Sequence, residues 1–299
     1  MKKEIKMKEI IKKAEILVDA LPYIRKFNGK TFVIKYGGAA QTKNDLKECF
    51  AQDIVMMNFI GIRTVIVHGG GPKISSTMKK MGKTPEFLHG QRITDQETMD
   101  IVEMVLGGLV NKEIVSLIGK HGGRSIGLSG KDGGLIKAKK KLVKKLTPET
   151  GVDEIIDLGL VGEVTSIDPS VIDSLDQSGF IPVISPIGIG QHGETLNINA
   201  DFVAAAVASS LKAEKLILLT DVPGILTKKG SIISTLGKRQ IKKLIKDNTI
   251  AGGMMPKVQS CLNALSGGVG KTHIIDGRIP HCLLLEIFTK EGIGTEILN

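Results

Sequence analysis

The sequence predicts an α/β fold, a three-layer αβα sandwich in which helices cover both faces of a mainly parallel central sheet. Two apolar strands at residues 31–36 and 63–68 carry this prediction, because each ends in glycines, at 37–38 and at 69–71. Helical periodicity follows each strand, and this strand–turn–helix alternation is typical of parallel sheets. Glycine turns at the carboxyl edge of such a sheet favour a bound anion.

The same alternation continues along most of the chain. Between residues 125 and 168 the pattern changes to short β-like pieces separated by glycines, which predicts hairpins that form a flap or an antiparallel edge. We expect a loop through residue 193 and two lobes divided near residue 195. The other predicted elements are helices at about 43–59, 72–81, 95–106, 111–120, 169–177, 202–211 and 238–247, a helix ending near 265, and strands at 180–185, 215–220 and 272–275.

An amphipathic helix is predicted before the first strand, within residues 8–24, and Pro22 should end or kink it near Ala20. A helix in this place has no neighbour in the basic βα repeat. Two interpretations therefore stay open: the helix folds back on its own domain, or it is an arm that pairs with another subunit. Its apolar stripe contains Ile10, Ile11, Ala14, Leu17, Val18, Leu21 and Ile24.

The composition indicates a globular protein that is neither secreted nor embedded in a membrane. The chain has 299 residues, of which 41% are hydrophobic, and this is ample for a large core. It has no apolar run of about 18 residues, and no apolar segment follows the N-terminal lysines. The three cysteines, Cys49, Cys261 and Cys282, are widely spaced, which favours reduced thiols in the cytoplasm and no metal site.

The net charge is +10, and the excess lies mainly in residues 2–13, 137–145 and 238–246. Clusters of this kind are found in nucleic-acid-binding proteins. Here, however, aromatic residues make up only 3% of the chain and there is no tryptophan. We expect solvated faces and a field that favours anionic substrates, without nucleic acid as a partner.

Two glycine motifs resemble nucleotide-binding sequences without fitting them. Residues 267–272 match the end of a Walker A loop, but Leu265 stands where the motif needs its first glycine, and a helix precedes it. Residues 188–193 match GxGxxG after a strand, yet no helix begins there and no acidic residue follows a second strand. We expect a helix stop in the first case and an ordinary active-site loop in the second.

Lys35, Lys257 and Asp201 are the candidate catalytic residues. Phosphoryl transfer requires cations and backbone N–H groups around a group whose charge spreads over its oxygens. Two glycine turns, two lysines and a carboxylate between them would meet this requirement. Taken singly, each feature has a plainer interpretation: glycines form ordinary turns, Arg92 could make a surface salt bridge, and Asp201 could stabilise a helix N-terminus.

Together the motifs resemble the amino acid kinase family, in the family's order and over nearly the whole chain. Within the family they are most similar to the members that phosphorylate N-acetyl-L-glutamate in arginine synthesis. The matching segments are Ile34-Lys35-Tyr-Gly-Gly38, Val65-Ile-Val-His-Gly-Gly-Gly71-Pro72, Gly90-Gln-Arg92-Ile-Thr94, Gly108-Leu-Val-Asn-Lys112, Asn197-Ile-Asn-Ala-Asp201, Leu219-Thr-Asp-Val-Pro-Gly224, Gly252-Gly-Met254 followed by Lys257, and His273-Ile-Ile-Asp-Gly-Arg278.

The resemblance implies a role for each site residue. Lys35 and Lys257 would stabilise the transferring phosphoryl group from opposite sides, and Asp201 would orient both lysines. Arg92 would bind the α-carboxylate of the acceptor. Gly70, Gly71 and Asn197 would complete the acceptor site, whereas Gly37, Gly38, Thr220, Asp221 and Gly224 would lie beside the nucleotide.

The resemblance also implies ATP as the phosphoryl donor, with Mg2+ held mainly by the phosphates of the nucleotide. Residues 28–195 would form the lobe for acceptor binding and dimerisation, and residues 196–299 the lobe for ATP binding and arginine sensing. The γ-carboxylate of the acceptor is already ionised at pH 7, so no general base is needed. We therefore expect His68, beside the glycines, to be structural.

Arginine-inhibited members of the family carry an extra N-terminal helix that interlaces dimers into a hexameric ring. Residues 14–24 resemble that helix and residues 281–295 resemble the accompanying C-terminal segment. The resemblance implies an arm at residues 1–27, a homo-hexamer built as a trimer of dimers, and feedback inhibition by L-arginine, and it leaves a PII-type regulator open as a partner. Arginine would bind near Tyr23, His281, Glu286 and Gly294.

Two alternatives stay open. A sibling kinase could phosphorylate carbamate, aspartate, glutamate or a nucleoside monophosphate, although residues 90–94 and 197–201 favour N-acetyl-L-glutamate. A non-catalytic arginine sensor could retain the fold, although Lys35, Asp201 and Lys257 are all present. A panel of acceptors separates the kinases from one another.

Overall fold

The computed structural model of the protein describes residues 2–88, 90–146 and 153–299. Its strands are β1 (Thr31–Tyr36), β2 (Arg63–His68), β3 (Phe87–Leu88), β4 (Gln91–Arg92), β5 (Ser125–Ser129), β6 (Ile136–Leu146), β7 (Asp153–Ile167), β8 (Ile181–Ser185), β9 (Ile187–Ile189), β10 (Thr195–Ile198), β11 (Lys215–Thr220), β12 (Thr235–Gly237), β13 (Lys271–Asp276) and β14 (Thr295–Leu298).

The helices are α1 (Lys2–Phe27), α2 (Asn44–Phe59), α3 (Gly71–Lys80), α4 (Gln96–Glu103), α5 (Asn111–Lys120), α6 (Ser170–Gln177), α7 (Ala200–Ser210), α8 (Lys238–Lys246), α9 (Met254–Ser266) and α10 (Cys282–Phe288). Two short 3-10 helices, η1 (Gly38–Gln41) and η3 (Asp132–Gly134), and a π-helix, η2 (Met104–Val110), complete the set.

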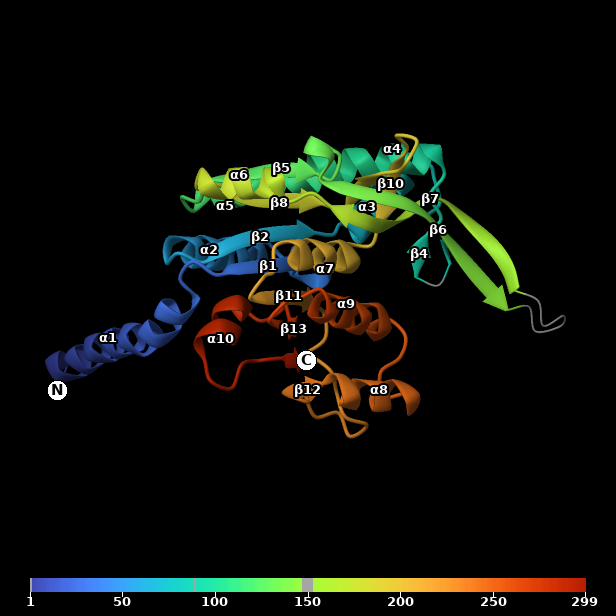
Figure 1. Ribbon diagram of the computed structural model, residues 1–299. Helices are drawn as coiled ribbons and strands as arrows, with labels where there is room; N and C mark the ends of the chain where they lie inside the picture. The colour runs from blue at the N-terminus through green and yellow to red at the C-terminus, as the bar shows by residue number, and fades with distance from the viewer. Residues whose placement is uncertain (1, 89, 147–152) are drawn as a thin grey trace.

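Within the described residues, one large sheet has the strand order β12-β14-β13-β11-β1-β2-β8-β5 (Figure 1). Every neighbouring pair in it is parallel except β13 and β14. The predicted strands at 31–36, 63–68 and 215–220 lie side by side in its centre as β1, β2 and β11. This arrangement brings the ends of β1, β2 and β11 to one edge of the sheet.

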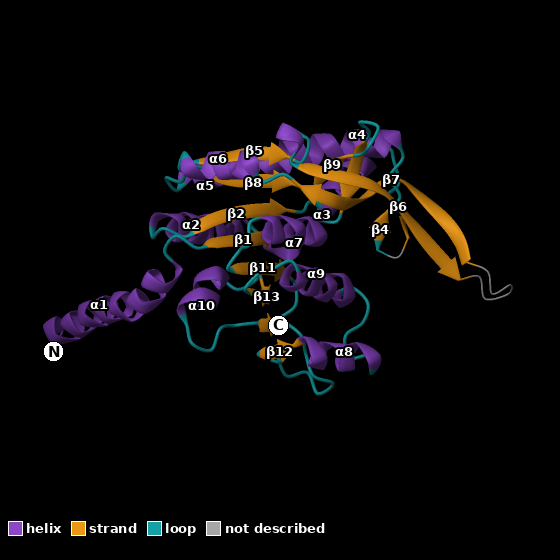
Figure 2. Cartoon of the chain, in the orientation of Figure 1, coloured by secondary structure: helices purple, strands orange, loops and turns teal. Residues whose placement is uncertain are grey.

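Helices cover both faces of this sheet, which confirms the predicted three-layer αβα sandwich (Figure 2). Side chains alternate along β1, so that Phe32 and Ile34 join the core under α2, α5 and α10. Val33 joins the second core, under α7 and α9. Both cores consist mainly of branched aliphatic side chains, as the apolar strands require.

A second, smaller sheet closes on itself through β10, β7, β6 and β9, and the hairpin of β6 and β7 projects from the body (Figure 1). The hairpin was predicted, and residues 147–152, which connect its strands in the sequence, lie outside the described residues. The prediction is wrong for residues 125–129, which form β5 and pair in parallel with β8 at the edge of the large sheet. Residues 187–189 form β9 where a loop was predicted, because short β-like pieces do not reveal their partners.

The predicted break between residues 106 and 111 is also wrong. The π-helix η2 joins α4 to α5, so the chain stays helical from residue 96 to residue 120. Gly107 and Gly108 lie inside this π-helix and not in a loop. A π-helical turn changes which side chains of the following helix face the sheet, and such turns are frequent at functional sites.

The helix α1 runs through Pro22 to Phe27, so of the two predicted effects of this proline, an end or a kink near Ala20, the end does not occur. A proline within a helix removes one hydrogen bond, and the helix tolerates this loss because its end is packed. Phe27 is buried and its ring meets that of Phe32 edge-on, with 5.2 Å between the centroids. Tyr23 contacts Phe288 of α10 in the same manner.

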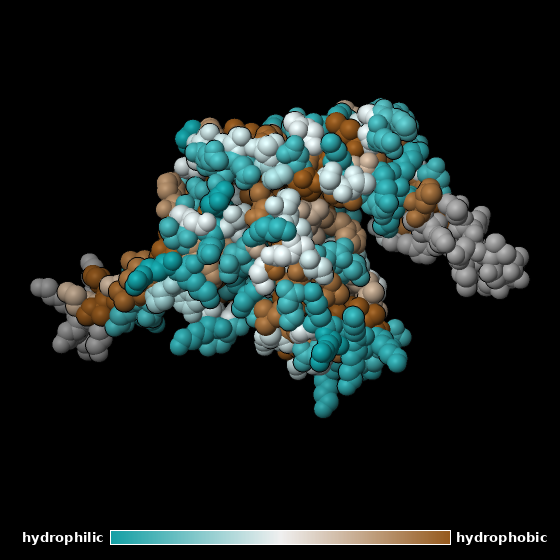
Figure 3. Space-filling model, in the orientation of Figure 1, coloured by the Kyte–Doolittle hydropathy of each residue, from teal (hydrophilic) through white to brown (hydrophobic). Residues whose placement is uncertain are grey.

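The rest of α1 extends away from the body and exposes its apolar side chains (Figure 3). Leu17 and Val18 are 68% and 66% exposed, so these residues do not fold back onto their own domain. In the described part of the chain, no helix is both long and apolar enough to cross a membrane. The exposed apolar side chains are Met7, Ile10, Ile11, Ile16, Leu17, Val18 and Leu21.

Candidate active site

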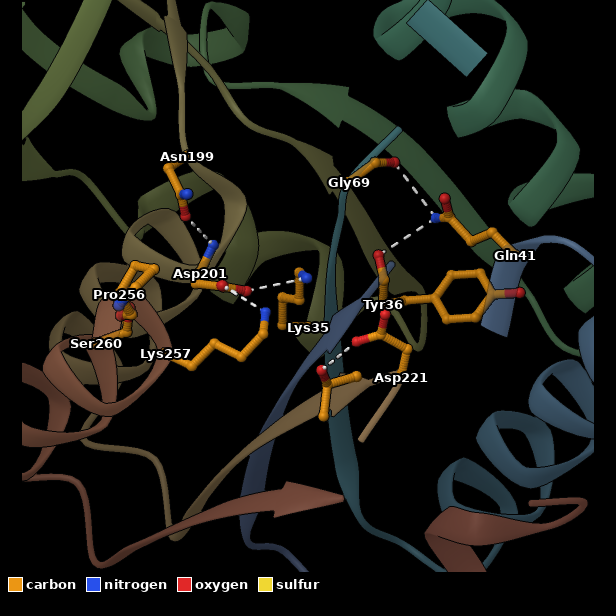
Figure 4. A network of polar contacts seen from close by, with 11 residues as sticks. Lys35, Tyr36, Gln41, Gly69, Asn199, Asp201, Asp221, Pro256, Lys257 and Ser260 are labelled. Carbon is orange, nitrogen blue, oxygen red and sulfur yellow. Dashed lines mark hydrogen bonds and ion pairs between the residues drawn. The ribbon is translucent and has the colours of Figure 1, made fainter. Parts of the chain in front are cut away.

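Two lysines from distant parts of the chain meet at one buried carboxylate. Lys35 reaches it from the carboxyl end of β1, and its Nζ lies 2.9 Å from Asp201 Oδ1. Lys257 reaches it from the first turn of α9, with its Nζ 3.0 Å from Asp201 Oδ2. Figure 4 shows both ammonium groups pointing toward Asp201 from different sides. We call Lys35, Asp201 and Lys257 the lysine clamp.

The charge of Asp201 is stabilised by its surroundings. The residue is only 4% exposed, and burial alone would raise the pKa of its carboxyl group. The two ammonium groups outweigh the burial and hold the pKa below its usual value, so the carboxylate is ionised at pH 7. Asp201 can therefore keep two positive charges at fixed positions, one on each of its oxygens.

Local structure fixes each member of the clamp. Asn199 caps α7, because its side-chain oxygen accepts a hydrogen bond of 2.8 Å from the Asp201 amide. Lys35 lies in a strand that is paired on both sides, with β11 and with β2. A Cβ atom at Gly37 would lie 3.0 Å from Lys35 Nζ, so the glycine leaves room for the ammonium group.

The two predicted glycine turns are linked to each other at the ends of β1 and β2. The Gly69 amide donates to Tyr36 O at 2.8 Å. The Gln41 Nε2 amide lies between the turns (Figure 4) and donates to Tyr36 O at 3.2 Å and to Gly69 O at 3.3 Å. Gly71 then begins α3, so the amides of its first turn have no partner within the helix and are available to an anion.

Arg92 is a buried cation without a carboxylate partner among the described residues. It is 7% exposed, and burial lowers its pKa. Its guanidinium donates from Nη2 to Ser75 Oγ at 2.8 Å and to Gly71 O at 3.1 Å, and it lies 4.6 Å from the ring centroid of Phe87. Its charge is thus held in place by neutral groups and is available to an anion.

A cavity of about 840 Å³ brings most of the predicted site residues together. It is bounded by the ends of the central strands, the start of α7, and the second sheet. Asn197 lines it from β10, where its Nδ2 lies 3.4 Å from Thr94 Oγ1. The predicted residues in its lining are Lys35, Gly70, Gly71, Arg92, Asn197, Asp201 and Lys257.

The residues predicted beside the nucleotide lie outside this lining but near the same edge of the sheet. Lys35 of β1 is paired with Leu218 of β11. Gly37 and Thr220 each come two residues after this pair, so they lie at the same level at the ends of two neighbouring parallel strands. Thr220 Oγ1 donates to Asp221 Oδ1 at 3.2 Å. Gly38 has φ +65° and Gly224 has φ +144°, and both conformations favour glycine.

The residues predicted for arginine binding all lie near α10, but His281 is directed away from the other three. Glu286 is buried in this helix and accepts a hydrogen bond of 2.7 Å from the Ile293 amide, next to Gly294. Tyr23 packs nearby on Phe288. His281 lies at the start of α10 and is directed toward α2, with its Nδ1 2.6 Å from Asp53 Oδ1.

A buried polar chain next to Glu286 could not be inferred from the sequence. His273 Nδ1 lies 2.6 Å from Glu286 Oε1, and its Nε2 lies 3.0 Å from Lys215 Nζ. Burial lowers the pKa of Lys215 to about 8, so the ammonium form still predominates at pH 7. The one sequence feature that pointed to this chain is Lys215, a charged residue at the start of a buried strand. The described residues contain no group of three or more acidic, histidine or cysteine side chains that could hold a metal ion.

Comparison with known proteins finds a family model that matches most of the chain and relatives that match nearly all of it. The model of the amino acid kinase family matches residues 30–276. A protein of Azoarcus sp. (strain BH72) named acetylglutamate kinase is 57% identical over 285 residues, which are 95% of this chain and 94% of the relative. A protein of the same name from Sulfurihydrogenibium sp. (strain YO3AOP1) is 56% identical over 297 residues, covering 97% of this chain and 99% of the relative.

Among solved structures, the N-acetylglutamate synthase of Neisseria gonorrhoeae with coenzyme A and N-acetyl-glutamate superposes with a TM-score of 0.82 at 28% identity. The match covers 96% of this chain and 63% of the synthase chain. The same synthase with coenzyme A and L-arginine gives a TM-score of 0.78 at 27% identity and covers 95% of this chain and 65% of the synthase chain.

The close packing at Gly70 predicts a stability difference between adjacent glycines. A Cβ atom at Gly70 would lie 2.6 Å from Leu106 Cδ2, whereas one at Gly71 would meet nothing within 4 Å. We predict that Gly70→Ala lowers the free energy of unfolding by about 1–3 kcal/mol, because overpacking a buried site costs this much. The matched control Gly71→Ala should stay within about 0.5 kcal/mol of wild type. Urea unfolding measures both, and equal losses would contradict the packing described.

Proposed function

Because the chain belongs to the amino acid kinase family and is therefore a kinase, we propose that it phosphorylates N-acetyl-L-glutamate. It transfers the γ-phosphoryl group of ATP to the γ-carboxylate of this acceptor, and the product is N-acetyl-L-glutamyl 5-phosphate, an intermediate of arginine biosynthesis. The observation that carries the proposal is the lysine clamp in one cavity with the unpaired cation Arg92. The names of the relatives that are more than half identical support the same acceptor.

The lysine clamp supplies electrostatic stabilisation of the transferring group. In phosphoryl transfer the charge spreads over three equatorial oxygens, and the protein contributes mainly position and charge. Lys35 and Lys257 approach from opposite sides because Asp201 holds one on each oxygen. Their positions are set before the substrates bind, so little reorganisation is required at the moment of transfer.

The reaction needs no general base. The γ-carboxylate of the acceptor is ionised at pH 7 and attacks phosphorus directly. His68 is fully buried, and burial lowers its pKa to about 4. It is therefore neutral at pH 7 and has no access to the cavity from which it could exchange a proton with the acceptor.

The acceptor is held by its other polar groups. Arg92 binds the α-carboxylate, for which a planar guanidinium is better suited than an ammonium group. Asn197 lines the same cavity and binds the acceptor as well. Gly70 and Gly71 offer backbone amides at the start of α3. The cavity thus places one carboxylate of the acceptor at Arg92 and leaves the other free to reach the lysine clamp.

ATP binds where the ends of β1 and β11 meet, beside Gly37, Gly38, Thr220, Asp221 and Gly224. Both carboxylate oxygens of Asp201 are already occupied by lysines. Mg2+ would enter with the nucleotide, would be held mainly by phosphate oxygens and water, and would supply further positive charge to the phosphates. Residues 28–195 form the acceptor lobe and residues 196–299 the nucleotide lobe.

The function is tested by trapping the acyl phosphate. Full-length protein is incubated with MgATP, N-acetyl-L-glutamate and hydroxylamine, and the hydroxamate formed is measured. We predict a hydroxamate that requires both ATP and the acceptor. The matched variant Lys257→Ala should form it about 30–1,000 times more slowly, the loss expected when one preorganised donor is removed.

Three results would count against the proposal. Hydroxamate from carbamate, aspartate or glutamate in place of N-acetyl-L-glutamate would identify a sibling kinase. No hydroxamate from any of these acceptors would leave a nucleoside monophosphate kinase or a non-catalytic protein. A Lys257→Ala variant with wild-type turnover would remove that lysine from the mechanism.

A substitution of Arg92 provides a second test, which concerns only the binding of the acceptor. Arg92→Lys loses the planar fork and its stacking on Phe87. We predict that KM for N-acetyl-L-glutamate rises about 10–100-fold, the value of a charged hydrogen bond, while kcat changes less than about threefold. The control is Arg124→Lys, which changes another stacked arginine, 4.1 Å from the ring of Phe180 and outside the cavity lining. Equal losses in kcat and KM at Arg92 would show that its role is misassigned.

Regulation by L-arginine and assembly through α1 form the second part of the proposal. The exposed apolar face of α1 is suited to pairing with another subunit, in a hexamer built as a trimer of dimers. The buried carboxylate of Glu286 lies close to the end of α1 and can bind the guanidinium group of L-arginine. His273 lies between Glu286 and Lys215 and contacts both. A relative solved with L-arginine supports this ligand. Tyr23 and Gly294 border the same region, and His281 lies at the opposite end of α10.

Removing residues 1–26 tests both the regulation by L-arginine and the assembly through α1. The shortened protein should still fold, because the buried Phe27 is retained. We predict that saturating L-arginine lowers the activity of the full-length protein by about 5–150-fold, the usual range of allosteric coupling. The shortened protein should be active, insensitive to arginine and smaller in solution by light scattering. D-arginine serves as the control ligand. A full-length protein that does not respond to L-arginine refutes the regulation.

A further inference from the structure

His68 ends β2 next to the glycine turn and makes two specific contacts. It is fully buried. Its Nδ1 lies 3.0 Å from Gly69 O, and its Nε2 lies 3.2 Å from Asn111 Nδ2. Both ring nitrogens are therefore occupied by protein groups. His68 does not line the cavity.

The groups around Asn111 determine which nitrogen of His68 carries the proton. Asn111 Nδ2 donates to Val183 O at 2.9 Å and to Leu128 O at 3.3 Å, and its Oδ1 accepts from Lys112 Nζ at 3.2 Å. Carbonyl oxygens only accept and an ammonium group only donates, so the orientation of the amide is fixed. The NH2 group thus faces His68 Nε2 and shares its two hydrogens among this nitrogen and the two carbonyl oxygens. An amide nitrogen donates but does not accept, so Nε2 carries no proton. The remaining proton is on Nδ1 and is donated to Gly69 O.

The Gly69 carbonyl controls the direction of the next amide. A trans peptide unit is planar, and its C=O and N–H point in opposite directions. Gly69 O is held by His68 on one side and by Gln41 on the other. The Gly70 N–H is therefore fixed as well, directed away from this contact. No hydrogen bond is formed by the Gly70 N–H within the described residues, and Gly70 lines the cavity.

We infer that His68 and Asn111 are positioning residues, which hold the Gly69 peptide so that the Gly70 N–H faces the reacting groups. This inference rests on the proposed function, in which that amide contacts the acceptor, and it extends the contact to the transferring phosphoryl group. The π-helix η2 supports this peptide at two points. Asn111 follows η2 directly, and Leu106 within η2 packs against Gly70. Gly127 leaves the space for Asn111, since a Cβ atom there would overlap Asn111 Oδ1.

A pair of amide variants separates positioning from simple packing. In His68→Asn the amide nitrogen can occupy the place of Nδ1 and still donate to Gly69 O. In His68→Gln it reaches the place of Nε2, and the donor to Gly69 O is lost. We expect kcat to fall about 10–100-fold in His68→Gln and to stay within about fivefold in His68→Asn. KM for the acceptor, set by Arg92, should change less than about threefold in both.

A structural role alone would give a different result. Both variants would then lose stability, and kcat per folded molecule would be the same in the two. Equal kcat values in His68→Asn and His68→Gln, with an active wild type, overturn the inference. Urea unfolding of each variant gives the folded fraction needed for this comparison.

The tautomer can be measured on the wild-type protein without any substrate. The full chain is labelled with 15N-histidine, and the signals of His68 are identified by their absence in His68→Asn. We expect a protonated Nδ1 and an unprotonated Nε2, unchanged between pH 6 and pH 8. A protonated Nε2, or titration within this range, overturns the inference. Absence of hydroxamate from wild-type protein would instead overturn the proposed function, and the two failures are thus distinguishable.

Discussion

One buried carboxylate between two ammonium groups is the constraint on which the rest of the structure depends. Two positive charges can be kept close together in a protein interior only if a negative charge compensates them. Asp201 does this while almost completely buried, and its pKa is lowered because both lysines contact it. Removing one partner of a buried ion pair typically costs about 3–5 kcal/mol, since an uncompensated charge remains. The fold must therefore deliver the ends of β1, α7 and α9 to the same place.

The parallel sheet solves this problem by topology. The strands β1, β2 and β11 end at the same edge of the sheet. Lys35 on β1, the glycine turn after β2 and the start of α7 therefore meet at one cavity without long loops. Backbone amides complete the site, and side chains that do not line the cavity hold the peptide units beside them. The Gly69 peptide illustrates this arrangement, because His68 and Gln41 hold its oxygen from two sides. A site of this kind consists of fixed charges and dipoles, and it suits a reaction in which the nucleophile is already ionised.

Features set by local sequence could be predicted, whereas most features that depend on contacts between distant segments could not. The strands at β1, β2 and β11 follow from apolar runs and glycine turns, and their bounds agree with the sequence prediction. Lys35 and Lys257 lie far apart in the sequence, and the requirements of phosphoryl transfer, together with the family resemblance, associated them with Asp201. The π-helix η2 gave no signal, because its glycines looked like a break between helices. The parallel edge strand β5 was missed because a short apolar run does not specify its partner. The chain from Lys215 through His273 to Glu286 joins three separate elements, and no spacing rule connects them.

The central claim is that the two lysines of the clamp act together on the transferring group. The most direct measurement is a crystal structure with MgADP, N-acetyl-L-glutamate and aluminium fluoride, which imitates the phosphoryl group in transfer. We predict a planar fluoride within hydrogen-bond distance of both Lys35 Nζ and Lys257 Nζ, with Asp201 still in contact with each. A structure in which either ammonium group is turned away from the fluoride, or in which Asp201 has released one of them, would contradict it.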